Sequence, residues 1–155
     1  MTRPSPLPEE QRRIIILCDC DPDTVPYGGL THDSREPLKW RGVQEGIPKL
    51  VEALDGIESE TGRRVNLTWC VRSDVQMKEI YGDAAWPYLE FRELWQRLQS
   101  RGDEIAWHPH VWRWSDEHRC WYQEIHDDEW IEQCLEEGYQ ALCRAVGRPV
   151  QSCRM

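Results

Sequence analysis

Two pairs of potential metal-ligating residues stand at alternate positions in the chain. Asp19 and Asp21 follow the apolar run at residues 14–18, and His108 and His110 follow a second, shorter apolar run. In an extended strand, the side chains at positions i and i+2 point to the same face. If two strands deliver these pairs to one side of a sheet, carboxylate oxygens and imidazole nitrogens meet and can hold a divalent metal ion.

The hydrophobic pattern predicts the elements that would carry these pairs. Continuous apolar runs are typical of strands in a buried parallel sheet, and they predict strands at residues 13–19, 65–71 and 104–108 and the start of a fourth at 149–155. Helical periodicity predicts helices at residues 46–59, 75–81 and 86–100, and a long one that Asp127 or Asp128 caps and Gly147 ends. A long loop is expected at residues 22–40 and a tryptophan-rich loop at residues 111–126.

Strands that alternate with helices indicate an α/β fold with a parallel sheet and right-handed crossovers. In such folds the site lies at the carboxyl ends of the strands. The two acids, the two histidines and Arg154, which ends the predicted fourth strand, all fall at these ends. This common position predicts one shared site.

Three motifs in the chain resemble those of the polysaccharide deacetylases with NodB homology, a metal-dependent group of carbohydrate esterases. The acid motif has its counterpart in residues 18–21 (Cys-Asp-Cys-Asp) and the histidine motif in residues 102–108 (Gly-Asp-Glu-Ile-Ala-Trp-His). The arginine motif corresponds to residues 147–154, where Gly-Arg-Pro precedes Ser-Cys-Arg. The resemblance, which covers residues 13–155, implies a parallel-strand β/α barrel of the deacetylase type, incomplete, with about four strands and their helices. Residues 1–12 are expected to be a disordered leader.

The resemblance also implies a role for each residue. Asp19 corresponds to the general base that takes a proton from water, and Arg154 to the basic residue that holds this base by charge-assisted hydrogen bonds. Asp21 and His108 correspond to metal ligands. The implied cofactor is a divalent metal ion, with Zn²⁺ or another first-row ion as the best match to these ligands.

The implied reaction is the removal of an N-acetyl group from an acylated sugar, which is the expected partner. The metal ion lowers the pKa of water and polarises the acyl carbonyl, and the products are acetate and a free amine. Trp112, Trp114 and Trp121 are candidates for stacking on the sugar ring. Core or lid packing is the alternative role for this tryptophan-rich loop.

The chain departs from the family pattern in two important ways. The family places its second metal-binding histidine four residues after the first, where this chain has Trp112, so His110 is expected to replace it. Family members also continue beyond the arginine motif with further strands and a late histidine that acts as general acid. We therefore expect that the chain alone is marginally stable, that it self-associates to cover its open sheet, or that it is a truncated piece of a barrel missing its C-terminal half.

Two other functions match parts of the pattern. An amidohydrolase-type metal hydrolase also uses His-x-His at a strand end, although normally on the first strand. A non-catalytic sugar-binding remnant of the deacetylase fold would bind glycan without a metal ion. Asp21 and Asp23 on either side of Pro22 are also typical of a simple turn, and Asp23, His118 or His126 are possible substitutes in the site.

Composition narrows the classes further. The chain of 155 residues is long enough for one domain with a core, and its net charge of −9 argues against nucleic acid as a partner. No apolar run reaches the roughly 18–20 residues of a membrane span, and the polar N-terminus lacks the apolar segment of a secretory signal. We therefore expect a cytoplasmic location, no membrane association and reduced thiols for the seven cysteines, which include no Cys-x-x-Cys pair.

Overall fold

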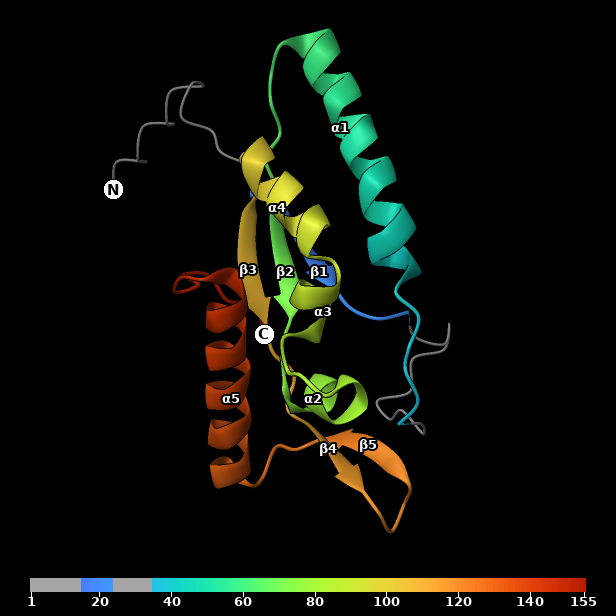
Figure 1. The fold of residues 1–155 in the computed structure, drawn as a ribbon, viewed down its shortest axis with the longest axis vertical. Helices are drawn as coiled ribbons and strands as arrows, with labels where there is room; N and C mark the ends of the chain where they lie inside the picture. Colours follow the sequence, from blue (N-terminus) through green and yellow to red (C-terminus); the bar gives the residue numbers. More distant parts are fainter. Residues whose placement is uncertain (1–14, 24–34) are drawn as a thin grey trace, which may run out of the picture.

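A computed structural model describes residues 15–23 and 35–155, and its centre is a parallel sheet of three strands. The strands are β1 (Leu17–Cys20), β2 (Thr68–Arg72) and β3 (Glu104–His108), in the order β1-β2-β3 (Figure 1). The predicted α/β class with a parallel sheet is confirmed. The expected leader at residues 1–12 and the first two residues of the predicted first strand lie outside the described residues.

The predicted fourth strand is reduced to one parallel bridge between Trp107 and Cys153. The amide of Trp107 donates to the carbonyl of Ser152, and the amide of Arg154 donates to the carbonyl of Trp107, both at 2.9 Å. The prediction of a four-stranded sheet is therefore wrong for the described residues. The bridge nevertheless places Arg154 beside the carboxyl end of β3.

The helices follow the predicted order with two changes. The single helix expected at residues 86–100 is broken at Phe91, and the helix expected from residue 46 begins as a π-helical turn. The observed elements are η2 (Gly42–Gly46), α1 (Ile47–Thr61), α2 (Val75–Tyr81), α3 (Trp86–Glu90), α4 (Arg92–Arg101) and α5 (Asp128–Val146). The side chains of Asp74 and Asp127 accept hydrogen bonds from the amides of Met77 and Trp130, so both cap a helix, and Asp127 is one of the two caps predicted for the long helix.

Helices α3 and α4 cover one face of the sheet, and α5 lies along the β3 side (Figure 1). Trp69, Trp95, Met77, Leu98 and Leu142 are among the largest fully buried side chains and belong to one hydrophobic core. Buried Asp103 accepts hydrogen bonds from the indole of Trp69 and the amide of Leu67, so it joins β2 to the start of β3. Among the described residues, no helix combines the length and the apolar character required to cross a bilayer. All seven cysteines are free thiols.

One close backbone approach fixes α5 against the turn that follows β2. The hydroxyl of Ser73 donates to the carbonyl of Gly138 at 2.9 Å. A Cβ atom placed on Gly138 would lie 2.4 Å from the carbonyl oxygen of Ser73, far inside van der Waals contact. Glycine is thus required at position 138 for packing, although helix interiors normally disfavour it.

The tryptophan-rich segment that was expected to be a loop contains an antiparallel hairpin. Its strands are β4 (Trp112–Ser115) and β5 (Cys120–Gln123), and it lies beyond the carboxyl ends of the sheet strands (Figure 1). Apolar and polar residues alternate in β4 (Trp-Arg-Trp-Ser) but not in β5 (Cys-Trp-Tyr-Gln). The four-residue turn between them contains no glycine, and Arg119 adopts the positive φ of 50° that glycine commonly supplies.

Glu124 joins the hairpin to α5. Its carboxylate accepts hydrogen bonds from the amides of His126 and Asp127, from the hydroxyl of Tyr122 at 3.0 Å, and from Arg113 at 3.2 Å. Arg113 also bonds Asp127, the cap of α5, at 2.8 Å. The amide of His126 above all, with the other donors, lowers the pKa of Glu124 to about 2 from the ordinary 4.5.

We expect Glu124→Gln to lower the melting temperature at pH 7 and to flatten its acid dependence. Because the pKa of Glu124 is lowered on folding, its charge stabilises the fold above pH 4.5, and this contribution is lost as the pH falls from 4.5 towards 2. The difference in melting temperature between wild type and variant should therefore shrink over that window. Thermal melts from pH 7 to pH 2 measure this, with the exposed Glu117→Gln as control. A constant difference across the range would contradict the prediction.

Candidate metal centre

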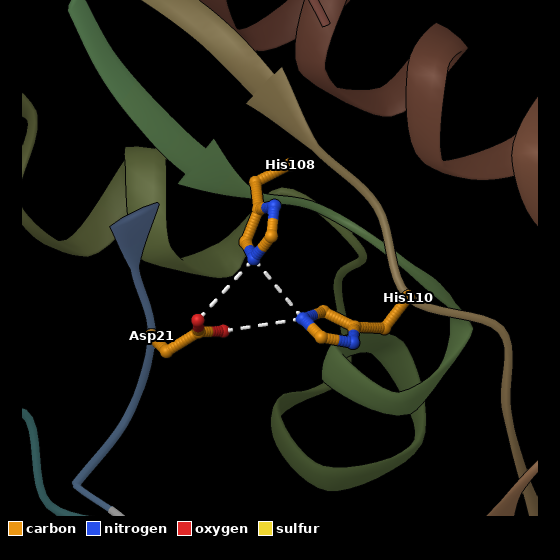
Figure 2. Close-up of side chains that lie close together, drawn as sticks. All are labelled: Asp21, His108 and His110. Carbon is orange, nitrogen blue, oxygen red and sulfur yellow. Dashed lines mark hydrogen bonds and ion pairs between the residues drawn. The ribbon is translucent and has the colours of Figure 1, made fainter. Parts of the chain in front are cut away.

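Asp21, His108 and His110 converge at the carboxyl ends of the strands, as predicted. Asp21 directly follows β1, His108 ends β3, and His110 lies two residues further on (Figure 2). His108 Nε2 lies 3.2 Å from Asp21 Oδ2 and 3.1 Å from His110 Nε2, and His110 Nε2 lies 3.6 Å from Asp21 Oδ1. In residues 15–23 and 35–155, this is the one cluster of potential metal ligands with such spacing.

The three separations match those between ligands of a single small cation. Ligand bonds of about 2.0–2.1 Å in a tetrahedral zinc site separate neighbouring ligand atoms by roughly 3.3–3.4 Å. The two Nε2 atoms point at each other (Figure 2), an arrangement that a shared cation or proton must stabilise because two lone pairs repel. One carboxylate and two imidazoles also form a donor set typical of Zn²⁺ and related ions. The residues therefore fit a divalent metal ion.

Asp21 is partly buried but remains ionised. Burial would raise the pKa of its carboxyl, but hydrogen bonds with His108 and His110 and the charge of Arg72 lower it well below the ordinary value. Its Oδ1 atom is buried without a hydrogen bond among the described residues, although the nearest Arg72 nitrogen lies 3.5 Å away. An ionised carboxylate with an unused oxygen is an available ligand.

His108 is held on the opposite side of its ring. Its Nδ1 lies 2.8 Å from the main-chain carbonyl oxygen of Arg154, which can accept the Nδ1 hydrogen and leave Nε2 free to bind. Burial lowers the pKa of His108, but the bonds to Asp21 and Arg154 outweigh it and raise the pKa above the ordinary value. A proton therefore competes with any cation for this site.

Asp19 and Arg154 form an ion pair beside the cluster. Arg154 Nε lies 2.7 Å from Oδ1 and 2.9 Å from Oδ2 of Asp19, and both side chains are partly exposed. Asp19 belongs to β1 and Arg154 follows the bridge to β3, so the pair extends across the width of the sheet. The structure thus brings together all five residues of the sequence-predicted metal and catalytic set.

Arg72 is a site residue that the sequence prediction missed. It ends β2 in register with His108 and is buried, and it also donates from Nε to Asp74 at 2.7 Å and from another nitrogen to Gln76. These contacts hold its charge next to Asp21. The sequence pattern could have identified Arg72, because this residue ends an apolar strand at the same edge of the sheet as the acids and the histidines.

The three tryptophans proposed to stack on sugar differ in position. The ring of Trp112 stacks on His110, with the ring centres 6.2 Å apart and the planes inclined at 24°. Trp114 and Trp121 pack edge-to-face on each other further along the hairpin, and Trp121 is fully buried, so neither is brought to the cluster. Trp112 alone lies beside a ligand residue.

The possible substitute ligands lie elsewhere. Asp23 accepts hydrogen bonds from Arg41 and the amide of Gly42, and so anchors the start of η2. His118 lies in the exposed hairpin turn, and the amide of His126 donates to Glu124.

Comparison of the chain with protein-family models, with curated proteins and with solved structures found no match.

Proposed function

We propose that the chain is a metal-dependent hydrolase resembling the polysaccharide deacetylases, which removes an N-acetyl group from an acylated sugar. The observation that supports this best is the convergence of Asp21, His108 and His110 beside an ion-paired Asp19. A ligand cluster alone serves many purposes. A partly exposed carboxylate next to it, held by an arginine, is what a hydrolase needs in order to take a proton from water.

A divalent ion, for which we propose Zn²⁺, supplies Lewis-acid activation of water and of the acyl carbonyl when bound. The protein's own residues supply the rest. Asp19 accepts the proton from the attacking water, and Arg154 fixes the direction of the Asp19 carboxylate through the contacts at 2.7 and 2.9 Å. Trp112, partly exposed beside His110, offers an aromatic face to the sugar ring. Water and the amide are converted to acetate and a free amine.

The proposal includes a parallel β/α barrel as the complete architecture and a cytoplasmic place of action. The exposed residues Ile15, Ile16 and Leu17 at the outer edge of the sheet support the idea that another surface covers this edge, by self-association in the simplest case. Size-exclusion chromatography with light scattering over a range of concentrations tests this part. A monomer at every concentration would contradict self-association.

Asp19→Asn is expected to keep the metal ion and lose turnover. The amide that replaces the carboxylate cannot act as a base, so acetate release from N-acetylated oligosaccharides should fall by about 10²–10⁴-fold, whereas the three ligand residues are untouched. Acetate release and metal content are measured on the same zinc-loaded samples. Asp55→Asn is a matched control, because Asp55 forms a partly exposed ion pair with Arg101 far from the cluster.

Full turnover in Asp19→Asn would overturn the proposed role of the base. If the wild type releases no acetate from any N-acetylated glycan but binds glycan equally well with and without a divalent ion, the chain is a sugar-binding module and the hydrolase proposal is wrong.

A further inference from the structure

The three ligand residues are held in place by different parts of the fold. Asp21 faces buried Arg72, and His108 lies in β3 with its Nδ1 against the Arg154 carbonyl. His110 follows Pro109 outside the strands of the described residues. The sheet that orients His108 therefore does not orient His110 directly.

The hairpin contacts His110 from both of its strands. Trp112 of β4 stacks on the imidazole, and the side-chain nitrogen Nε2 of Gln123 of β5 lies 3.4 Å from its Nδ1 atom. Trp112 and Gln123 are register partners at the open end of the hairpin. One cross-strand pair thus surrounds one ligand ring.

We propose that Gln123 is a positioning residue for the metal centre and that it selects the tautomer of His110 which binds the ion through Nε2. This inference rests on the metal centre proposed above. Nε2 can bind a cation only if the ring hydrogen is on Nδ1, and that hydrogen then needs an acceptor. Gln123 Nε2 now faces His110 Nδ1. A half-turn of the amide about its last bond exchanges Nε2 with Oε1, which has nearly the same size and can accept the Nδ1 hydrogen.

Each of the two histidines then has a hydrogen-bond acceptor for its Nδ1 hydrogen. His108 can give its Nδ1 hydrogen to the carbonyl of Arg154, and His110 can give its own to Oε1 of Gln123 after the half-turn, so both Nε2 atoms would be free to bind an ion. The backbone that carries Gln123 is fixed, because the amide of the next residue, Glu124, donates to the carbonyl of Val111 at 2.9 Å. The network around Glu124 thereby extends from the start of α5 to a metal ligand.

The test compares Gln123→Leu, which removes the acceptor, with Gln123→Glu, which keeps an acceptor and adds charge. Co²⁺ is the probe, because its visible absorption reports both occupancy and coordination geometry. We expect Gln123→Leu to weaken Co²⁺ binding about 10–100-fold and to change the spectrum, and Gln123→Glu to bind at least as tightly as wild type. Gln140→Leu on α5, where the amide contacts Glu136, is the matched control and should bind normally.

The outcomes separate this inference from the metal centre itself. If wild type and Gln123→Leu bind Co²⁺ equally tightly, Gln123 does not position His110, and the metal centre stands without it. Equal losses in Gln123→Leu and Gln123→Glu also overturn the inference, since a retained acceptor should rescue binding. If the wild-type chain binds no Co²⁺, the metal centre fails, and this inference fails with it.

Discussion

Replacing His108 or Asp21 by alanine is expected to weaken zinc binding by more than about 100-fold. Each change removes one of three ligands, whereas loss of a residue that only orients a ligand typically costs about 10–100-fold. Competition against a chromophoric chelator gives the affinity, and elemental analysis gives the metal content. Full metal content in both variants would show that the cluster holds no ion.

Asp21→Ala is expected to change the stability of the metal-free protein as well as its zinc affinity. Asp21→Ala leaves the buried charge of Arg72 with Asp74 as its remaining carboxylate partner, so this variant should also melt earlier without metal. His110→Ala removes a ligand outside the strands and is the milder test if His108→Ala folds poorly. His118→Ala, in the exposed hairpin turn, is the matched control.

Zinc should also raise the melting temperature of the wild type. A ligand that binds only the folded state stabilises it by about 2.7 kcal/mol at 100 times its dissociation constant. This increment should disappear in Asp21→Ala and His108→Ala at the same zinc concentration. A zinc-induced shift that persists in both variants would assign the stabilisation to another site.

Gly138→Ala is expected to lower the free energy of unfolding by about 1–3 kcal/mol, as overpacking in a close contact typically does. The added Cβ would lie 2.4 Å from the Ser73 carbonyl oxygen, which belongs to the backbone and cannot rotate away. That same oxygen accepts the indole hydrogen of Trp107 at 2.9 Å, so the displacement also disturbs the neighbour of His108 in β3. Urea denaturation followed by circular dichroism measures the change.

Gly56→Ala is the matched control for Gly138→Ala. Gly56 lies in α1, and a Cβ atom there would have no neighbour within 4 Å. Alanine should therefore be tolerated and should stabilise the helix by about 0.5–1 kcal/mol. Equal effects of the two substitutions would mean that helix propensity, and not the contact with Ser73, decides the role of Gly138.

The sequence predicts the parallel sheet and the cluster of Asp21, His108 and His110 because both depend on simple periodicities. A strand places residues i and i+2 on one face, and parallel strands bring their carboxyl ends to one edge, so Asp21 and His108 had to approach. Periodicity does not predict the break between α3 and α4. Apolar residues continue with helical spacing on both sides of Phe91, and periodicity alone does not show a change of helix direction there.

The hairpin was missed for a related reason. Its turn has neither Asn-Gly nor Asp-Gly, and contacts such as those of Arg113 with Glu124 and Asp127, 11 and 14 residues further along the chain, stabilise it instead. Such contacts join residues that no local pattern relates. Gln123 could not be assigned to the site for the same reason, because its contact with His110 exists only once the hairpin has formed.

The pair of Asp19 and Arg154 joins positions 135 residues apart. On the ribosome, Asp19 is made with β1, the first described strand, whereas Arg154 is made after every helix and strand described here. The backbone of the same arginine also supplies the acceptor for His108. A nascent chain therefore cannot form the Asp19–Arg154 ion pair or the contact between His108 and the Arg154 carbonyl until its synthesis has passed residue 154.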